Sequence, residues 1–286
     1  MVTVLPSYVG MCLPLLRPST FIDFTKASHS LRVHFFVILS ALFDIGGSMG
    51  TAVGLFYTGS GIYQVLFSSV IIFTALVSRL FLKRPLSWRQ WGSVFIVTFG
   101  LALSASSGGE DQQRSNILIG SVFVLSGTVL ISSAYVIDQH ILDQGMMESR
   151  HLCYYTGLYS SILVLVYILT YTVPRFEDLI LSQVALAEGN MRQIVWVFLA
   201  LCGVNVAHNS AYFVIVEEEG SVTTGLLQSL RAVAVFFASA LMYCHVHAEQ
   251  CMTLNKALSA FVVVGGVIAF LVSPSALPIR NKVAVV

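Results

Sequence analysis

Residues 45–78 of the chain read IGGSMGTAVGLFYTGSGIYQVLFSSVIIFTALVS, and these 34 residues include no Asp, Glu, Lys or Arg. A helix that crosses a bilayer needs about 20 mainly apolar residues. Five further gaps between charged residues last 20 to 24 residues, at 90–109, 115–137, 151–174, 193–216 and 257–279. Spanning β-strands would alternate in polarity over roughly 10 residues, and these stretches do not alternate. We therefore expect an all-α integral membrane protein.

The composition excludes several other classes of protein. The chain has 286 residues, of which 10% are charged and 56% are hydrophobic, and its mean hydropathy is +0.83. Soluble domains carry about 25% charged residues. The net charge of +1 provides no basic surface for nucleic acid. Because the sequence also has no phosphate-binding glycine loop, zinc-protease helix or nucleophile elbow, we expect no enzyme, no cofactor and no metal.

The apolar stretches predict about eight spanning helices, at Val33–Tyr57, Tyr63–Leu82, Trp88–Ser106, Ile117–Ile141, Tyr154–Val173, Ile194–Val216, Val222–Tyr243 and Leu254–Val272. Residues 1–32 form an amino-terminal segment, in which Met1–Leu16 is too short and too broken by prolines for a span. Residues 274–286 form a tail.

The distribution of Lys and Arg predicts the orientation in the membrane. One side of the predicted bundle holds ten of the fifteen basic residues and the other side holds four, while Arg231 lies inside a span. Because basic residues are enriched in cytoplasmic loops, the side with ten is expected to be cytoplasmic. The carboxyl terminus lies on that side.

Two parts of the sequence match each other weakly. Residues 61–66 align with residues 225–230 at an offset of 164, and residues 93–100 align with residues 259–266 at an offset of 166. The predicted helices that carry these matches run in opposite directions through the membrane, which is typical of the inverted repeats of secondary transporters. The first repeat would take residues 33–115, with three helices, and the second residues 116–273, with five.

Four short stretches resemble a known family: 60–76 (SGIYQVLFSSVIIFTAL), 82–92 (LKRPLSWRQWG), 220–224 (GSVTT) and 229–233 (SLRAV). They are similar to the drug/metabolite transporter superfamily, and most of all to the F-type branch of the nucleotide-sugar-transporter-like solute carrier 35 group. The resemblance implies ten helices in two inverted repeats with both termini cytosolic, so that the first two helices would be missing or truncated here. It also implies an endomembrane location and a small-molecule solute such as a nucleotide sugar. F-type relatives tend to carry a basic residue where Phe67 stands in this chain.

Arg231 is the first candidate for a binding residue. A charged residue at the centre of a spanning helix costs roughly 2.5–3.5 kcal/mol on insertion scales, so it should face a partner or a wet cavity. Thr224, Gln228 and Arg231 share one helical face. Arg231 would anchor the phosphate or carboxylate of an anionic solute. The alternative is a structural ion pair with Asp44.

Two other helical faces are polar. Asp44 lies on one of them with Ser48 and Thr51, beside four glycines, and would either titrate during coupling or balance Arg231; the glycines indicate close packing or a flexible gate. The other face would form a hydrogen-bonding wall for a sugar or base, or else bond to a neighbouring helix; it carries Asn205, His208, Asn209 and Tyr212.

Several further polar residues would complete a central cavity or, singly, serve only in packing: Gln64, Ser68, Ser132, Tyr135 and Gln139. The cysteines of Cys244-His-Val-His247 and Cys251 allow a disulfide, a Zn²⁺ site or a plain loop, and we favour the plain loop. Two functions remain open. The polar faces and the repeat favour a solute transporter, with the lipid bilayer and a small solute as partners, whereas the missing helices favour a non-transporting adaptor. A homodimer is left open.

Overall fold

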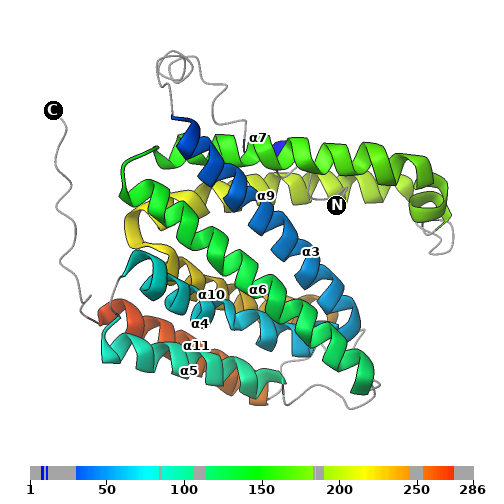
Figure 1. Cartoon of the computed structure of the whole chain (residues 1–286). Coiled ribbons are helices and arrows are strands. Elements are labelled where there is room, and N and C mark those ends of the chain that lie inside the picture. Colours follow the sequence, from blue (N-terminus) through cyan, green and yellow to red (C-terminus); the bar gives the residue numbers. More distant parts are fainter. Residues whose placement is uncertain are drawn as a thin grey trace. The chain divides into compact units, whose positions relative to one another are not determined.

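The computed structural model describes residues 8, 9, 11, 30–83, 86–105, 114–182, 184, 190–244 and 254–273, with the backbone alone at some helical positions, among them Gln64 and Arg231. All regular structure within these ranges is helical (Figure 1), which confirms the expected all-α class. The expected spans fall on α3 (Leu31–Ser68), α4 (Val70–Val77) with η2 (Ser78–Leu82), α5 (Trp88–Ala105), α6 (Arg114–Asp143), α7 (Ser149–Tyr167), α9 (Met191–Glu219), α10 (Ser221–Tyr243) and α11 (Leu254–Val272).

Two helices differ from the expected ranges. The helix α3 continues through residues 58–62, where a break between the first two spans was expected, although its apolar spanning part is Leu31–Thr58 and a second apolar helix runs over Leu66–Leu82. The helix α7 continues as short 3-10 and π-helical turns to Leu181, beyond the predicted end of that span at Val173.

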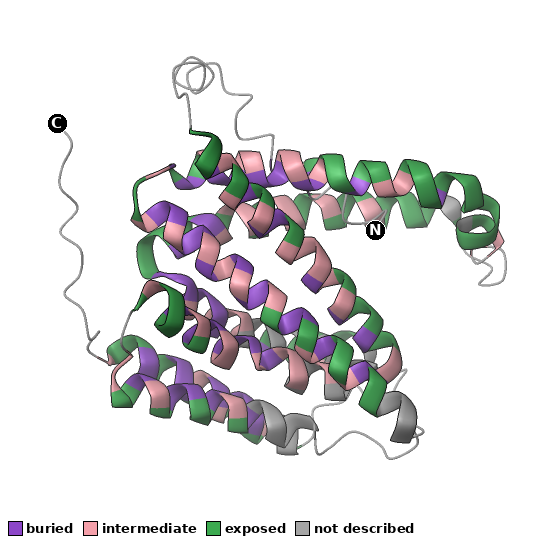
Figure 2. Ribbon diagram, viewed as in Figure 1, coloured by how far each residue is buried: buried purple, intermediate pink, exposed green. Residues whose placement is uncertain are grey.

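Four helices in the described ranges are long and apolar enough to cross a membrane: Leu31–Thr58, Leu118–Asp143, Ser149–Arg175 and Arg192–Glu219. Large apolar side chains on these and other helices point outward, and exposed positions follow much of α7 and α9 (Figure 2). Trp196 of α9 is 64% exposed and Phe261 of α11 is 79% exposed. Because exposed apolar surface of this extent is unfavourable in water, lipid is its natural surrounding.

The chain divides into two compact units. Unit 1 comprises residues 1–45 and 137–218, and unit 2 comprises residues 46–136 and 219–286. The helices α3 and α6 contribute to both units. The two predicted repeats divide the chain differently, because each unit takes residues from both of them.

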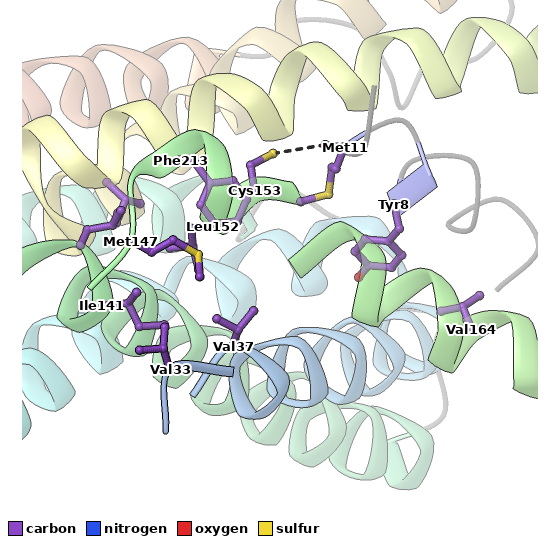
Figure 3. Close-up of a cluster of buried hydrophobic side chains, with 12 residues drawn as sticks. Tyr8, Met11, Val33, Val37, Ile141, Met147, Leu152, Cys153, Val164 and Phe213 are labelled. Atoms are coloured by element: carbon purple, nitrogen blue, oxygen red, sulfur yellow. Dashed lines mark hydrogen bonds between the residues drawn. The ribbon is translucent and has the colours of Figure 1, made fainter. Parts of the chain in front are cut away.

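The core of unit 1 joins the amino-terminal stretch to the starts and ends of three spans. Tyr8 and Met11 pack with Val37 of α3, Cys153 of α7 and Phe213 of α9. Figure 3 shows these side chains around a common interior, with the Cys153 thiol donating a hydrogen bond of 3.9 Å to the Met11 carbonyl oxygen. The Met1–Leu16 stretch therefore contributes core residues, although it is not expected to span the membrane.

Unit 2 is organised by α5 and α11, which pack through glycines. A Cβ added at Gly100 would lie 3.0 Å from a methyl group of Val263, and one added at Gly266 would lie 2.7 Å from a methyl group of Val97. In the alignment of residues 93–100 with residues 259–266, Val97 corresponds to Val263 and Gly100 corresponds to Gly266. The contact between Gly100 and Val263 is therefore equivalent to the contact between Gly266 and Val97. Such reciprocal contacts between antiparallel helices are what an inverted repeat would produce.

The helices α3 and α6 also pack closely, within unit 2, through small residues. A Cβ at Gly127 would lie 2.7 Å from the Gly47 carbonyl oxygen and 2.8 Å from the Thr51 methyl group. A Cβ at Gly120 would lie 2.7 Å from the Thr58 methyl group. The contacting residues have rising numbers along α3 and falling numbers along α6, so the two helices are antiparallel. The close packing expected from the glycines of α3 is confirmed.

Candidate functional site

Among the Asp, Glu, Lys and Arg side chains that the structure describes, the one with the smallest exposed fraction lies in unit 1, on α6. Asp138 is only 3% exposed. Its Oδ1 accepts a hydrogen bond of 2.6 Å from the Ser40 hydroxyl of α3, and its Oδ2 accepts one of 3.0 Å from the Tyr212 hydroxyl of α9. A single carboxyl group therefore connects three of the four long apolar helices.

A second carboxyl group of unit 1 belongs to Asp44 on α3. It is partly buried, and its Oδ2 accepts a hydrogen bond of 2.7 Å from the Tyr8 hydroxyl. Asp44 and Asp138 interact electrostatically. Within the described ranges, neither carboxyl group has a basic hydrogen-bond partner. The side chain of Arg231 is not among the described residues, so the ion pair between Arg231 and Asp44 stays a prediction.

The amino-terminal part of α3 also contacts the middle of α7, within the same unit. The Tyr159 hydroxyl lies 2.9 Å from Nδ1 of His34. The His34 ring also packs edge-on against Tyr155, with the ring centroids 4.9 Å apart. Unit 1 thus holds carboxyl, phenol and imidazole groups within a largely apolar core.

Unit 2 holds the candidate residues of α10. Nε2 of Gln228 donates a hydrogen bond of 3.4 Å to the Tyr135 hydroxyl of α6, so two predicted site residues do come together. Thr224 is buried and bonds the Gly220 carbonyl of its own helix. On the facing helix α4, the hydroxyl of Thr74 is fully buried and has no hydrogen-bond partner. Arg231 follows Gln228 by three residues and so lies on the same face of the α10 backbone.

The four polar residues of α9 lie in different surroundings. Tyr212 bonds Asp138, whereas Asn205 bonds the Leu201 carbonyl of its own helix. His208 is exposed and Asn209 is partly buried. The bond from Tyr212 to Asp138 is of the kind expected if this face bonds to a neighbouring helix, and the hydrogen-bonding wall for a solute stays a prediction.

The remaining candidates are placed as follows. Ser68 is buried, and Ser132 donates to the Val70 carbonyl of α4. Gln139 is buried. Thr51 donates to the Ser48 carbonyl of its own helix. The side chain of Gln64 lies outside the described residues.

Three residues of the unit 1 cluster were not among the candidates: Tyr8, Ser40 and Asp138. Asp138 could have been found, because it lies inside the predicted span Ile117–Ile141 and an acidic residue within a span is a candidate by default. Ser40 and Tyr8 carried no such signal, since a lone hydroxyl in an apolar stretch is common.

Cys244 at the end of α10 is disulfide-bonded. The favoured interpretation of this region as a plain loop is therefore wrong for Cys244, and the disulfide alternative is correct; the following residues, 245–253, lie outside the described ranges. Cys153 and Cys202 form no disulfide. Among the described residues, no group of three or more His, Cys, Asp or Glu side chains could hold a metal ion.

Comparison with known proteins finds several relatives. The chain is 36% identical over 135 residues to an uncharacterised protein of Schizosaccharomyces pombe, which is 47% of this chain and 42% of that protein. It is 31% identical over 104 residues to solute carrier family 35 member F6 of Mus musculus, which is 35% of this chain and 28% of that protein. The human member F6 is 25% identical over 140 residues, or 47% of this chain and 38% of that protein. The chain thus matches less than half the length of each of these relatives.

These relatives confirm the resemblance to the F-type branch of the solute carrier 35 group. Together with the apolar helices, they identify the chain as an integral membrane protein. A profile described as CRT-like, chloroquine-resistance transporter-like, matches residues 5–191, which is more than half of the chain. The protein therefore belongs to the CRT-like, chloroquine-resistance transporter-like family.

Proposed function

We propose that the chain forms a secondary transporter that carries a small polar solute across a membrane by alternating access. The observation that carries this proposal is Asp138, a carboxyl group that is 3% exposed in a spanning helix and is hydrogen-bonded from two other spanning helices. Ionisable groups inside membranes are costly and typically mark solute or ion pathways. A non-transporting adaptor would have no need to bury one.

The proposed solute is anionic, of the nucleotide-sugar class, and Arg231 is its principal anchor. Arg231 is the eleventh residue of the 23-residue helix α10, so a rise of about 1.5 Å per residue places its backbone near the middle of the helix. Gln228, Tyr135 and Thr224 lie on or against the same part of α10 and supply hydrogen-bonding groups. A guanidinium group can replace part of the hydration that an anion loses on entering the membrane.

The proposed mechanism of alternating access rests on the two inverted repeats. The reciprocal contacts of Gly100 with Val263 and of Gly266 with Val97 support a two-fold relation between α5 and α11. Carriers with such repeats exchange one access state for the other by moving one bundle of helices against another.

The proposed location is an endomembrane, with the carboxyl terminus in the cytoplasm. Disulfides persist in oxidising compartments and are rare in the cytosol. The disulfide of Cys244 therefore supports a lumenal position for the end of α10. That position agrees with the distribution of Lys and Arg, which puts this end opposite to the cytoplasm.

Uptake into proteoliposomes tests the proposal. Purified protein is reconstituted, and the probe is UDP-N-acetylglucosamine with a radioactive label. We expect saturable uptake, which Arg231→Lys lowers at least about tenfold because the charge remains but the bidentate fork is lost. Arg89→Lys, at an exposed position at the start of α5, is the matched control and should leave uptake unchanged.

Two outcomes would contradict parts of the proposal. Normal uptake by a folded Arg231→Ala variant would exclude Arg231 as the anchor. If Arg231→Ala misfolds and the added change Asp44→Asn restores folding, the two residues form a structural ion pair. The adaptor function gains support if no uptake of any nucleotide sugar is seen with folded, reconstituted protein.

A further inference from the structure

Three buried hydroxyl groups on α7, those of Thr156, Ser160 and Ser161, have no hydrogen-bond partner among the described residues, and the first two belong to the buried positions of the helix. Thr156 is 5% exposed and Ser160 is 0% exposed, and neither hydroxyl is bonded to any group that the structure describes. Serine and threonine in helices usually bond the carbonyl four residues earlier, as Ser133 and Thr170 do here. A buried polar group without a partner calls for an explanation such as a bound water or ion.

These hydroxyls face the core of unit 1. On α7 the buried positions include Cys153, Thr156, Ser160 and Val164, which follow one another at helical spacing. Cys153 and Val164, at the two ends of this row, pack into the same cluster as Tyr8 (Figure 3). Thr156 and Ser160 lie between them on the same face, and the Tyr8 hydroxyl in turn bonds Asp44.

The same unit holds two carboxyl groups, those of Asp44 and Asp138, whose described hydrogen-bond partners are hydroxyl groups. Both oxygens of Asp138 accept hydrogen bonds from hydroxyl groups. In the part of the chain that the structure describes, the carboxyl group of Asp44 has one hydrogen bond, on Oδ2, so its other oxygen is available as a ligand. In its ionised form, a carboxyl group without a basic partner inside a membrane needs a cation for neutrality.

We propose that Asp44, together with the hydroxyls of Thr156 and Ser160, binds a small monovalent cation, Na⁺, in the core of unit 1. Hard cations take oxygen ligands, which all three side chains supply. A single free carboxylate oxygen beside neutral hydroxyls matches one positive charge better than two. A proton would neutralise the carboxyl group but would leave both hydroxyls unsatisfied.

The role of this ion in transport rests on the proposed function: Na⁺ would be the coupling ion of the carrier, as it is in transporters that bind Na⁺ near the midplane of the membrane. Binding of the ion itself does not depend on the identity of the solute. The site can therefore be tested without any transport measurement, and its failure would leave the proposed transport of nucleotide sugars untouched.

The experiment measures binding of radiolabelled Na⁺ to the purified full chain in detergent, at constant ionic strength with choline chloride as the replacement salt. We expect saturable binding that unlabelled Na⁺ displaces. Asp44→Asn should abolish it, while Thr156→Val and Ser160→Ala should each weaken it at least about tenfold, since each removes one ligand oxygen. The matched control is Thr170→Val on the same helix, whose hydroxyl bonds its own backbone, and it should bind as the unmodified chain does.

A second measurement guards against variants that merely fail to fold. Because a ligand that binds only the folded state raises stability, Na⁺ should raise the melting temperature of the unmodified chain and of Thr170→Val, but not that of Asp44→Asn. The proposal is overturned if folded protein binds no Na⁺, or if the Thr156→Val and Ser160→Ala variants bind it normally. The proposal is also overturned if a lower pH raises the melting temperature while Na⁺ does not. That result would show that protons, rather than Na⁺, neutralise the carboxyl groups.

Discussion

At the scale of single residues, the hydrogen bonds of Asp138 are the most consequential polar contacts in unit 1. A carboxyl group buried inside a membrane protein cannot form hydrogen bonds with bulk water. Each hydroxyl group that donates a hydrogen bond to it therefore reduces the free-energy cost of its burial. Ser40 and Tyr212 reach Asp138 from helices on either side of α6 in the sequence. Their loss should therefore cost more than the loss of an ordinary serine or tyrosine hydroxyl.

The change Ser40→Ala tests this point. It removes one of the two donors to Asp138, and we expect the free energy of unfolding to fall by about 1–2 kcal/mol, which is typical of a hydrogen bond to a charged group inside a membrane protein. Ser133→Ala, on α6 itself, removes a hydroxyl that bonds only the Val129 carbonyl of its own helix, and it should change the value by less than about 0.5 kcal/mol. Chemical unfolding in detergent micelles measures both variants, and equal effects would show that Asp138 gains little from Ser40.

At the scale of the elements, the contact between α3 and α6 depends on the absence of side chains. Without a hydrophobic force between helices in lipid, association rests on close packing, and glycine allows the two backbones to approach. Gly47 and Gly127 face each other across this contact, and the Gly47 carbonyl occupies the space that a Cβ at Gly127 would need. The backbone oxygen cannot move away as a flexible side chain could.

Gly127→Ala should therefore destabilise the protein, by about 1–3 kcal/mol as for other overpacked sites. The matched control is Gly203→Ala on α9, because an added Cβ there has no neighbour within 4 Å. Replacing glycine by alanine inside a helix is otherwise favourable by about 0.5–1 kcal/mol, so Gly203→Ala should be neutral or slightly stabilising. The folded yield from size-exclusion chromatography and the melting temperature in detergent compare the two. A Gly127→Ala variant as stable as the control would contradict the close contact.

At the scale of the whole molecule, the proposed orientation rests on two observations. Ten basic residues on one side of the predicted bundle, against four on the other, predict a cytoplasmic carboxyl terminus. The disulfide of Cys244 supports a position of the end of α10 on the other side, which agrees with this prediction because one more helix follows α10.

Protease protection in sealed vesicles measures this orientation. An epitope tag at the carboxyl terminus should be digested when cytoplasmic-side-out vesicles are treated with protease, whereas a tag inserted between residues 246 and 247 should be digested only after detergent is added. The disulfide predicts in addition that Cys244 resists a membrane-impermeant maleimide until a reductant is present. Digestion of the inserted tag in intact vesicles would reverse the proposed topology.

The apolar stretches, such as residues 45–78, were sufficient to predict the helical class and the approximate positions of the long helices, although not the continuation of α3 through residues 58–62. This succeeds because a chain inside lipid must satisfy its backbone hydrogen bonds within each segment, so length and apolarity determine the element without knowledge of its neighbours. The family resemblance was likewise readable from short motifs. The glycines of α3 predicted close packing for the same reason, since small residues at helical spacing have few other uses.

The partners of the polar residues were decided by the tertiary structure alone. Nothing in the sequence near Asp44 pointed to Tyr8, which lies 36 positions away, or near Asp138 to Ser40, which lies 98 positions away. Charge alone suggested an ion pair of Asp44 with Arg231 as one alternative, and helical spacing alone could not distinguish a solute-binding wall on α9 from a contact with a neighbouring helix such as the bond from Tyr212 to Asp138. Which hydroxyl reaches which carboxyl depends on the register and rotation of packed helices, and those are set by contacts between residues far apart in the chain.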